Sequence, residues 1–276
     1  MSRRTRGLAL LVGAALALTA CSGGGSSAPE AGPTPVLRSA TASPTPTDPP
    51  KPPPPPGPRT CYRLGYDDAL APTNDQKPVP CTGKHTAITF FVGHFDPKLA
   101  VDGDPVHQLE STACPRRFAT FVGGSIEDRR LSLLRTVWFT PTVDDAALGA
   151  HWFQCVAIAL QGDQQLAPLV GPMGGVLDRP EARDHYALCG TAEPGTDGFE
   201  QRMCGVSHSW QALRTVVFPP GRYPGEDEVK AAGQTPCQDA GRDVASDPLN
   251  YRWSYQWPTP QQWQAGQTWG TCWAPA

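Results

Sequence analysis

The sequence predicts an α+β fold made of two tandem disulfide-stapled repeats. Each repeat is a small antiparallel sheet with one or two helices, and both follow a disordered proline-rich linker. Eight cysteines fall into two sets of four with matching order and similar spacing. Strand-like and helix-like runs recur in the same order around both sets. The segment ahead of them is rich in proline and nearly free of apolar side chains, so it cannot form a core.

The chain begins with a segment typical of export. Residues 1–20 place three arginines ahead of an apolar stretch that is too short to span a bilayer. Leu18-Thr19-Ala20-Cys21 resembles a bacterial lipobox, in which the cysteine is acylated after cleavage. We interpret residues 1–20 as a lipoprotein signal peptide and Cys21 as the lipidation site; ordinary secretory cleavage near Ala20 is the alternative. Lipidation would attach the chain to the extracytoplasmic face of the bacterial cell membrane.

Residues 21–59 have the composition of a tether. A glycine- and serine-rich start leads into a stretch that holds thirteen of the chain's 32 prolines. Such a sequence favours an extended, polyproline-like spacer over a packed domain. The folded part is therefore expected from residue 60 onward.

The net charge argues against a nucleic-acid partner. Without residues 1–21 the chain keeps 20 basic and 26 acidic side chains, a net charge of −6. A chain of this charge repels polyanions and has no general attraction to anionic lipid headgroups.

The first repeat is assigned to residues 60–180 and the second to residues 181–276. In both, 32 residues separate the second cysteine from the third. In both, the second cysteine is followed after three residues by a histidine, His85 or His208. An even number of cysteines in an exported chain indicates a disulfide framework.

Both repeats have the same predicted order of elements. A β-rich run follows the histidine, a helix carries the third cysteine, a late strand follows, and the fourth cysteine comes last. Proline and acidic residues at the helix start suit the first turn of a helix. The β-rich runs lie at 86–95 and 212–220, the helix starts at 104–105 and 224–228, and the late strands at 131–139 and 251–257.

We predict that all four disulfides close within a repeat. The first two cysteines of each set flank a short stretch that can fold back as a loop. The third and fourth would join the helix to the sheet. Each closed loop would contribute about 3–4 kcal/mol by the chain-entropy estimate. The predicted pairs are Cys61–Cys81, Cys114–Cys155, Cys189–Cys204 and Cys237–Cys272.

Four of the eight tryptophans lie in the last twenty residues. Trp257 aligns with Trp138, provided that the first repeat carries two extra residues after it. Trp269 lies three residues before its cysteine, as Trp152 does. Because these positions recur, we interpret Trp257 and Trp269 as mainly core residues.

The remaining two tryptophans of this stretch have no partner in the first repeat. Trp263 and Trp273 are therefore candidate exposed ligand contacts, since tryptophan is often only partly buried. His85 and His208 are weaker candidates for recognition, because a histidine beside a disulfide more often closes a turn through a backbone hydrogen bond.

Together these motifs resemble the septum formation domain of actinobacterial envelope proteins, here as two tandem copies. The first repeat departs from the family pattern, with Trp138-Phe139 in place of Trp-Pro and with Asp-Gly-Asp-Pro at the helix start. The resemblance implies a role in division-septum formation and carries no catalytic residue with it. The second repeat supplies nearly all of the pattern: Cys189, Cys204, His208, Pro224-Gly225-Glu226, Cys237, Trp257-Pro258, Trp263, Gly266 and Cys272.

The Cys-x3-His motif allows two sharper interpretations. A cysteine nucleophile with a histidine base needs a free thiolate. A zinc site built from both motifs needs four reduced or neutral ligands. Matched sets of four cysteines outside the cytoplasm favour disulfides over both, so we expect no metal and no cofactor. Serine-hydrolase and zinc-peptidase motifs are missing, although the sequence leaves a glycosidase-type carboxylate pair open.

The sequence therefore predicts a cell-envelope lipoprotein that acts as a non-catalytic binding or scaffold module in septum formation or cell-wall processes. Its partner would be another envelope protein. The alternative is a binder of peptidoglycan or another wall polysaccharide that uses Trp263 and Trp273. A third and more distant alternative is an envelope hydrolase.

Overall fold

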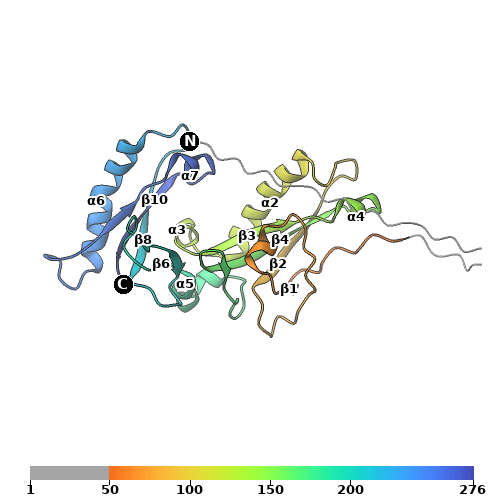
Figure 1. Ribbon diagram of the computed structural model, residues 1–276, viewed down its shortest axis with the longest axis horizontal. Helices are drawn as coiled ribbons and strands as arrows, with labels where there is room; N and C mark the ends of the chain where they lie inside the picture. Colours follow the sequence, from red (N-terminus) through yellow and green to blue (C-terminus); the bar gives the residue numbers. More distant parts are fainter. Residues whose placement is uncertain (1–49) are drawn as a thin grey trace, which may run out of the picture. The chain divides into compact units, whose positions relative to one another are not determined.

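The computed structural model describes residues 50–276 (Figure 1). The predicted signal peptide, Cys21 and the tether up to residue 49 lie outside the described residues. Two antiparallel sheets, each accompanied by one 19-residue helix, confirm the predicted fold class. No helix in the described part is long and apolar enough to cross a membrane.

The first half contains the sheet β1-β2-β4-β3, with the short strand β5 paired to β4. The long helix α2 packs on this sheet against β2, β3 and β4. The elements are β1 (Cys61–Tyr62), α1 (Tyr66–Leu70), β2 (Ala87–His94), α2 (Asp104–Val122), α3 (Ile126–Arg130), β3 (Leu134–Phe139), α4 (Val143–Ala147), β4 (Trp152–Gly162) and β5 (Gln165–Leu166).

The second half contains the sheet β7-β6-β8-β10-β9, on which α6 packs against β8, β9 and β10. A short segment with η1 and α5 connects the halves. The elements are η1 (Val176–Asp178), α5 (Pro180–Tyr186), β6 (Leu188–Gly190), β7 (Gln201–Met203), β8 (Trp210–Val217), α6 (Glu226–Val244), β9 (Ser254–Gln256), α7 (Pro260–Gln264) and β10 (Trp269–Pro275).

The two halves repeat the same strand order. Val79 forms an isolated bridge with Cys61, in the place that β7 takes beside β6. Both sheets also carry the same bulge. The extra residues are Phe90 in β2 and Leu213 in β8. In each half, the residue that follows the extra one pairs with the last cysteine of that half, on the neighbouring strand. A bulge adds one residue to a strand and bends it.

The strand register corrects the alignment of the tryptophans. Cys155 pairs with Trp138 in the first half, whereas Cys272 pairs with Tyr255 in the second. Trp138 therefore corresponds to Tyr255, and the predicted match with Trp257 is wrong.

The helix caps give the same result. Thr142 caps α4 and Thr259 caps α7, each accepting a hydrogen bond from the backbone N–H three residues later. Both threonines lie the same number of residues before the last cysteine of their half. The first half therefore has no two-residue insertion in this stretch, contrary to the prediction. Both halves read Pro-Thr at the cap, and this dipeptide is the true point of alignment.

Four disulfides stabilise the described residues, and they are the four predicted pairs: Cys61–Cys81, Cys114–Cys155, Cys189–Cys204 and Cys237–Cys272. In each half one bridge closes the loop ahead of the first long strand, and the other ties the long helix to the last strand. No bridge joins the halves, as predicted.

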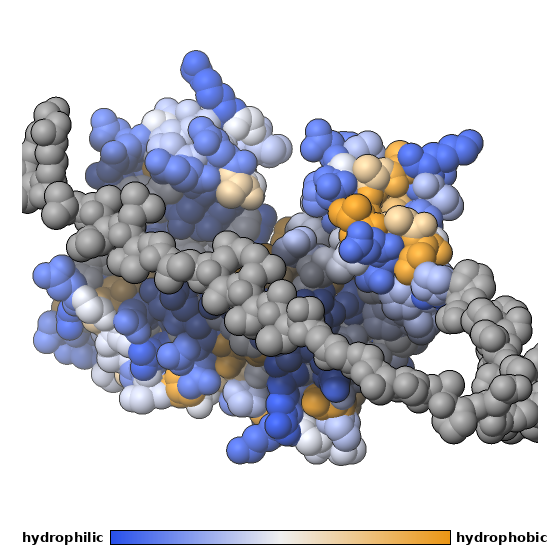
Figure 2. Space-filling view, turned by 45° about the vertical axis from the view of Figure 1, so that its right-hand side comes forward, coloured by the Kyte–Doolittle hydropathy of each residue, from blue (hydrophilic) through white to orange (hydrophobic). Residues whose placement is uncertain are grey.

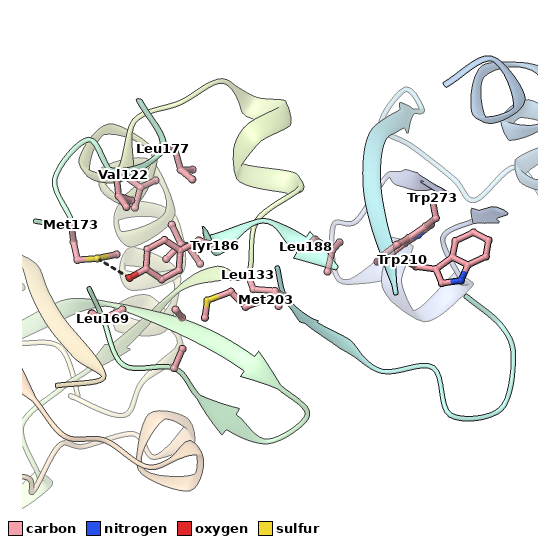
Figure 3. Close-up of a cluster of buried hydrophobic side chains, with 14 residues drawn as sticks. Val122, Leu133, Leu169, Met173, Leu177, Tyr186, Leu188, Met203, Trp210 and Trp273 are labelled. Atoms are coloured by element: carbon pink, nitrogen blue, oxygen red, sulfur yellow. Dashed lines mark hydrogen bonds between the residues drawn. The ribbon is translucent and has the colours of Figure 1, made fainter. Parts of the chain in front are cut away.

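Hydrophobic packing does join the halves. One buried cluster runs from Val122 and Met173, through Leu188, to Trp210 and Trp273 of the second sheet (Figure 3). We call this cluster the shared core. The described residues, 50–276, accordingly belong to one compact unit.

Polar contacts cross the same boundary. Ser132 and Ala187 form a β-bridge. The Glu127 carboxylate accepts hydrogen bonds from the Thr215 backbone N–H at 2.8 Å and from the Thr215 hydroxyl at 3.1 Å. Because α3 carries Glu127 and β8 carries Thr215, these bonds fix the first half against the second.

Candidate functional site between the two halves

Trp263 is not the exposed contact that was predicted. Its side chain is only 7% exposed and packs against Phe218 and Tyr223. Its indole Nε1 donates a hydrogen bond to the Gly221 carbonyl at 2.6 Å. The cap at Thr259 fixes the start of α7, and this start places Trp263 on the inner face of the single helical turn. Trp263 is therefore buried although its neighbours in the sequence are polar.

Trp273 is also buried, and completely so. It lies on β10, a strand with neighbours on both sides, and meets Phe199 edge-on at 5.4 Å between ring centroids. One face of β10 is covered by α6 and the other contributes to the shared core. The prediction of a ligand contact is therefore wrong, because Phe199 and the other side chains of the shared core cover this face of β10.

The two histidines close turns. His85 Nδ1 lies 2.8 Å from the Gly83 carbonyl oxygen, and His208 Nδ1 lies 2.8 Å from the Val206 carbonyl oxygen. His85 is buried and His208 is half-buried. The recurrence of this contact supports the turn-closing interpretation over recognition.

One group of side chains has the composition of a metal site. The ligand atoms of Cys189, Cys204 and His208 lie within 4.8 Å of one another. The two sulfurs are joined in a disulfide, however, and cannot act as thiolate ligands. These residues therefore do not fit zinc in the oxidised protein.

A cleft of about 660 Å³ lies between the halves, a size within the range of ligand sites. We call it the interhalf cleft. Its walls come from α2, α3 and β3 of the first half and from α7 and the turn into β10 of the second. Figure 2 shows the surface hollowed between two lobes, with hydrophilic residues over much of this face.

Two tryptophans line this cleft, and one of them, Trp269, was predicted to be mainly a core residue. Trp138 and Trp269 are both half-buried, from the first and second half respectively. The Arg130 guanidinium lies over the Trp269 ring at 4.5 Å from its centroid. Such a cation–π contact holds the arginine in place while leaving its edge available to a ligand.

The interhalf cleft is positively charged. Three arginines line it, and no carboxylate does. Arg129 donates to the Gly123 and Gly124 carbonyls, and Arg135 donates to the carbonyls of residues 132 and 134. None of the three arginines forms a salt bridge within the described residues.

Burial lowers the pKa of Arg135 from its usual range. Arginine nevertheless remains a cation in proteins. Neutral carbonyls orient Arg129 and Arg135, and Trp269 orients Arg130. Asp128 balances part of the charge of Arg129, whose attraction helps to lower the pKa of that carboxyl. The cleft still offers net positive charge to an anionic ligand, because no carboxylate of the described residues lines it.

A second unusual side chain lies on α2. Glu110 is 1% exposed, and its Oε1 has no hydrogen-bond partner. Its Oε2 is 3.5 Å from His107 Nδ1. Burial raises the pKa of Glu110 to about 7, against the smaller opposing attraction of His107. Trp138 borders both the small pocket beside Glu110 and the interhalf cleft.

The second half shows that this carboxyl is not required by the fold. Gly233 occupies the same place on α6, four residues before the helix cysteine. The ring of Tyr255 leaves no room there for a Cβ atom. Tyr255 corresponds to Trp138. The space beside the helix that the Tyr255 ring fills in the second half therefore holds the Glu110 carboxylate in the first half.

These features define a class of protein: an oxidised α+β protein with two structurally equivalent halves, a shared core and a cationic, aromatic cleft between them. The family model described as "Septum formation" matches residues 95–272, more than half of the chain. The chain belongs to this family.

The family match is one continuous stretch that contains both walls of the interhalf cleft. Membership connects the chain with septum formation and related processes of cell division. Comparison with curated proteins and with solved structures found no match.

Proposed function

We propose that the chain is a non-catalytic binding or scaffold protein of the cell envelope, which takes part in septum formation by holding a partner in the interhalf cleft. The observation that carries this proposal is the cleft itself, where Trp269 of the second half meets Trp138 and three arginines of the first half that form no salt bridge within the described part of the chain. The family supports the process, and the cleft supports binding as the mode of action.

The side chains in the cleft favour binding over catalysis. General acid–base catalysis needs a carboxyl, histidine or comparable group within reach of the substrate. The polar groups of the cleft come from arginine, glutamine and threonine. Glu110 and His107 lie in the neighbouring pocket, with Glu110 closed off from solvent.

A photocrosslinking residue placed at Ala265 tests this function in cells. Ala265 is exposed and lines the cleft, so it should capture an envelope protein that localises to the septum. The matched control is the same residue at Leu249, which is 95% exposed and outside the cleft. Equal capture at both positions would contradict the proposal. Retention of the purified chain on peptidoglycan, lost when Trp138 is replaced by alanine, would assign the cleft to a wall polymer instead.

We also propose that Cys21 anchors the protein to the membrane. The support is the Leu-Thr-Ala-Cys motif after an export segment, together with four disulfides that suit an oxidising compartment. Cys21→Ala should release the chain from the membrane fraction or leave its signal uncleaved, whereas Ser22→Ala should leave it anchored. Fractionation and the mass of the N-terminal peptide measure both outcomes. A Cys21→Ala chain that is still cleaved and membrane-bound would overturn the anchor.

A further inference from the structure

The interhalf cleft exposes the edge of a sheet. β3 is the last strand in the order β1-β2-β4-β3, so one of its two sides has no neighbouring strand. Residues 134, 135, 136 and 138 of this strand line the cleft. The open side of β3 is therefore part of the wall where a partner is proposed to bind.

Only part of this edge is already occupied. Beyond one end of β3, the Thr140 N–H donates to the Pro72 carbonyl at 3.0 Å. Toward the other end, the Arg135 guanidinium donates to the Leu134 carbonyl at 2.8 Å. Alternate residues of a strand direct their backbone groups to the same side. The backbone groups of Thr136 and Trp138 therefore also face the open side, where no partner is found among residues 50–276.

Unpaired backbone groups at a sheet edge can pair with an added strand. Proteins commonly prevent this with a proline, a bulge or a covering loop. β3 has no proline, and the bulge of this sheet lies on the far side of β4, in β2. The opening at Thr136 and Trp138 can thus accept two residues of an extended chain.

We infer that the interhalf cleft binds an extended acidic peptide segment of another protein, which adds as a short strand to the edge of β3. Backbone hydrogen bonds to Thr136 and Trp138 would give the affinity. Acidic side chains would pair with Arg129 and Arg130, and an apolar one would lie against Trp269. This inference rests on the proposed function and names the chemistry of the partner.

Two other occupants fit less well. A polysaccharide has no regular row of amide N–H and carbonyl groups to match a strand edge. The chain's own residues 21–59 contain thirteen prolines, which lack the N–H that a strand must donate. The same segment has only two acidic residues, Glu30 and Asp48, to meet three arginines.

Selection from a display library of linear peptides, roughly ten residues long, on the purified full chain tests the inference. Enriched peptides should carry aspartate or glutamate at alternate positions. N-methylation of their backbone at alternate residues should weaken binding at least about tenfold, because it removes the donated hydrogen bonds. Failure to enrich acidic peptides, or full binding of the methylated forms, would overturn the inference.

Variants of the chain supply the second readout. Thr136→Pro removes the outward N–H from the edge while leaving the pairing of β3 with β4, since proline is tolerated on an edge strand. Arg130→Glu reverses a charge in the cleft. Each should lower affinity for the selected peptide at least about tenfold with little change in melting temperature. Arg242→Glu, on the exposed end of α6, is the matched control and should bind normally.

The outcomes separate this inference from the proposed function. Septal capture at Ala265 with normal peptide binding by Thr136→Pro would leave the cleft as a partner site and reject strand addition. Strand-dependent peptide binding without capture at Ala265 would support the inference and reject the role in cells.

Discussion

Replacing Trp273 by alanine is expected to destabilise both halves of the protein together. The side chain is completely buried in the shared core, which contains residues of both halves, so its removal leaves a cavity in that core. Deleting a large core aromatic costs about 3–5 kcal/mol, a large share of the 5–15 kcal/mol typical of a folded domain. The melting temperature should fall by about 10 °C.

The matched control is Trp257→Ala. Trp257 is half-buried and packs under the Lys230 ammonium, which lies 4.5 Å from the ring centroid. Its removal should cost less and affect only the second half. Amide hydrogen exchange of β2 and β8 measures the spread of each effect. If Trp273→Ala speeds exchange in β8 but leaves β2 unchanged, the core is not shared energetically.

A second large effect is expected from Glu110 as the pH changes. Burial raises its pKa in the folded protein to about 7, compared with 4.5 for an exposed glutamate. Between these values the folded state holds a proton that the unfolded state has lost. The free energy of unfolding should therefore fall as the pH rises from about 5 to about 8, by up to about 3 kcal/mol.

Glu110→Gln tests this directly. The amide has nearly the same shape and no charge, so the variant should be more stable than the parent at pH 8 and nearly equal to it at pH 4.5. Urea unfolding at several pH values measures the difference. Glu228→Gln, an exposed change on α6, is the control and should keep the parent's pH dependence. If the free energy of unfolding of Glu110→Gln falls with pH as steeply as that of the parent, ionisation of Glu110 does not destabilise the folded protein.

Local features of the fold could be predicted from the sequence. The Cys61–Cys81 and Cys189–Cys204 pairs follow from short intervals between cysteines, and the turn contacts of His85 and His208 follow from their position beside a bridge. Strands and helices around each cysteine also follow, because local composition determines them.

The burial of the tryptophans could not be predicted, because it depends on which surfaces the two halves cover. Trp273 lies in an ordinary strand, and its burial depends on Phe199 and the rest of the shared core, which tertiary packing brings to it. The interhalf cleft brings Arg130 and Trp138 to Trp269, more than a hundred residues away in the chain. The two Pro-Thr caps are the sequence signal for the true alignment, whereas the Trp-Pro dipeptide occurs only in the second half.

The distribution of bonds between and within the halves has a consequence for the order of folding. Each of the four disulfides joins two cysteines of the same half. The two bridges of the first half can therefore form while the second half is still being synthesised and exported. The shared core can form only after Trp210 and Trp273 arrive. We therefore expect oxidation to precede final packing. A chain that stops before β6 should form Cys61–Cys81 and Cys114–Cys155, yet bind a hydrophobic dye until the missing half is supplied.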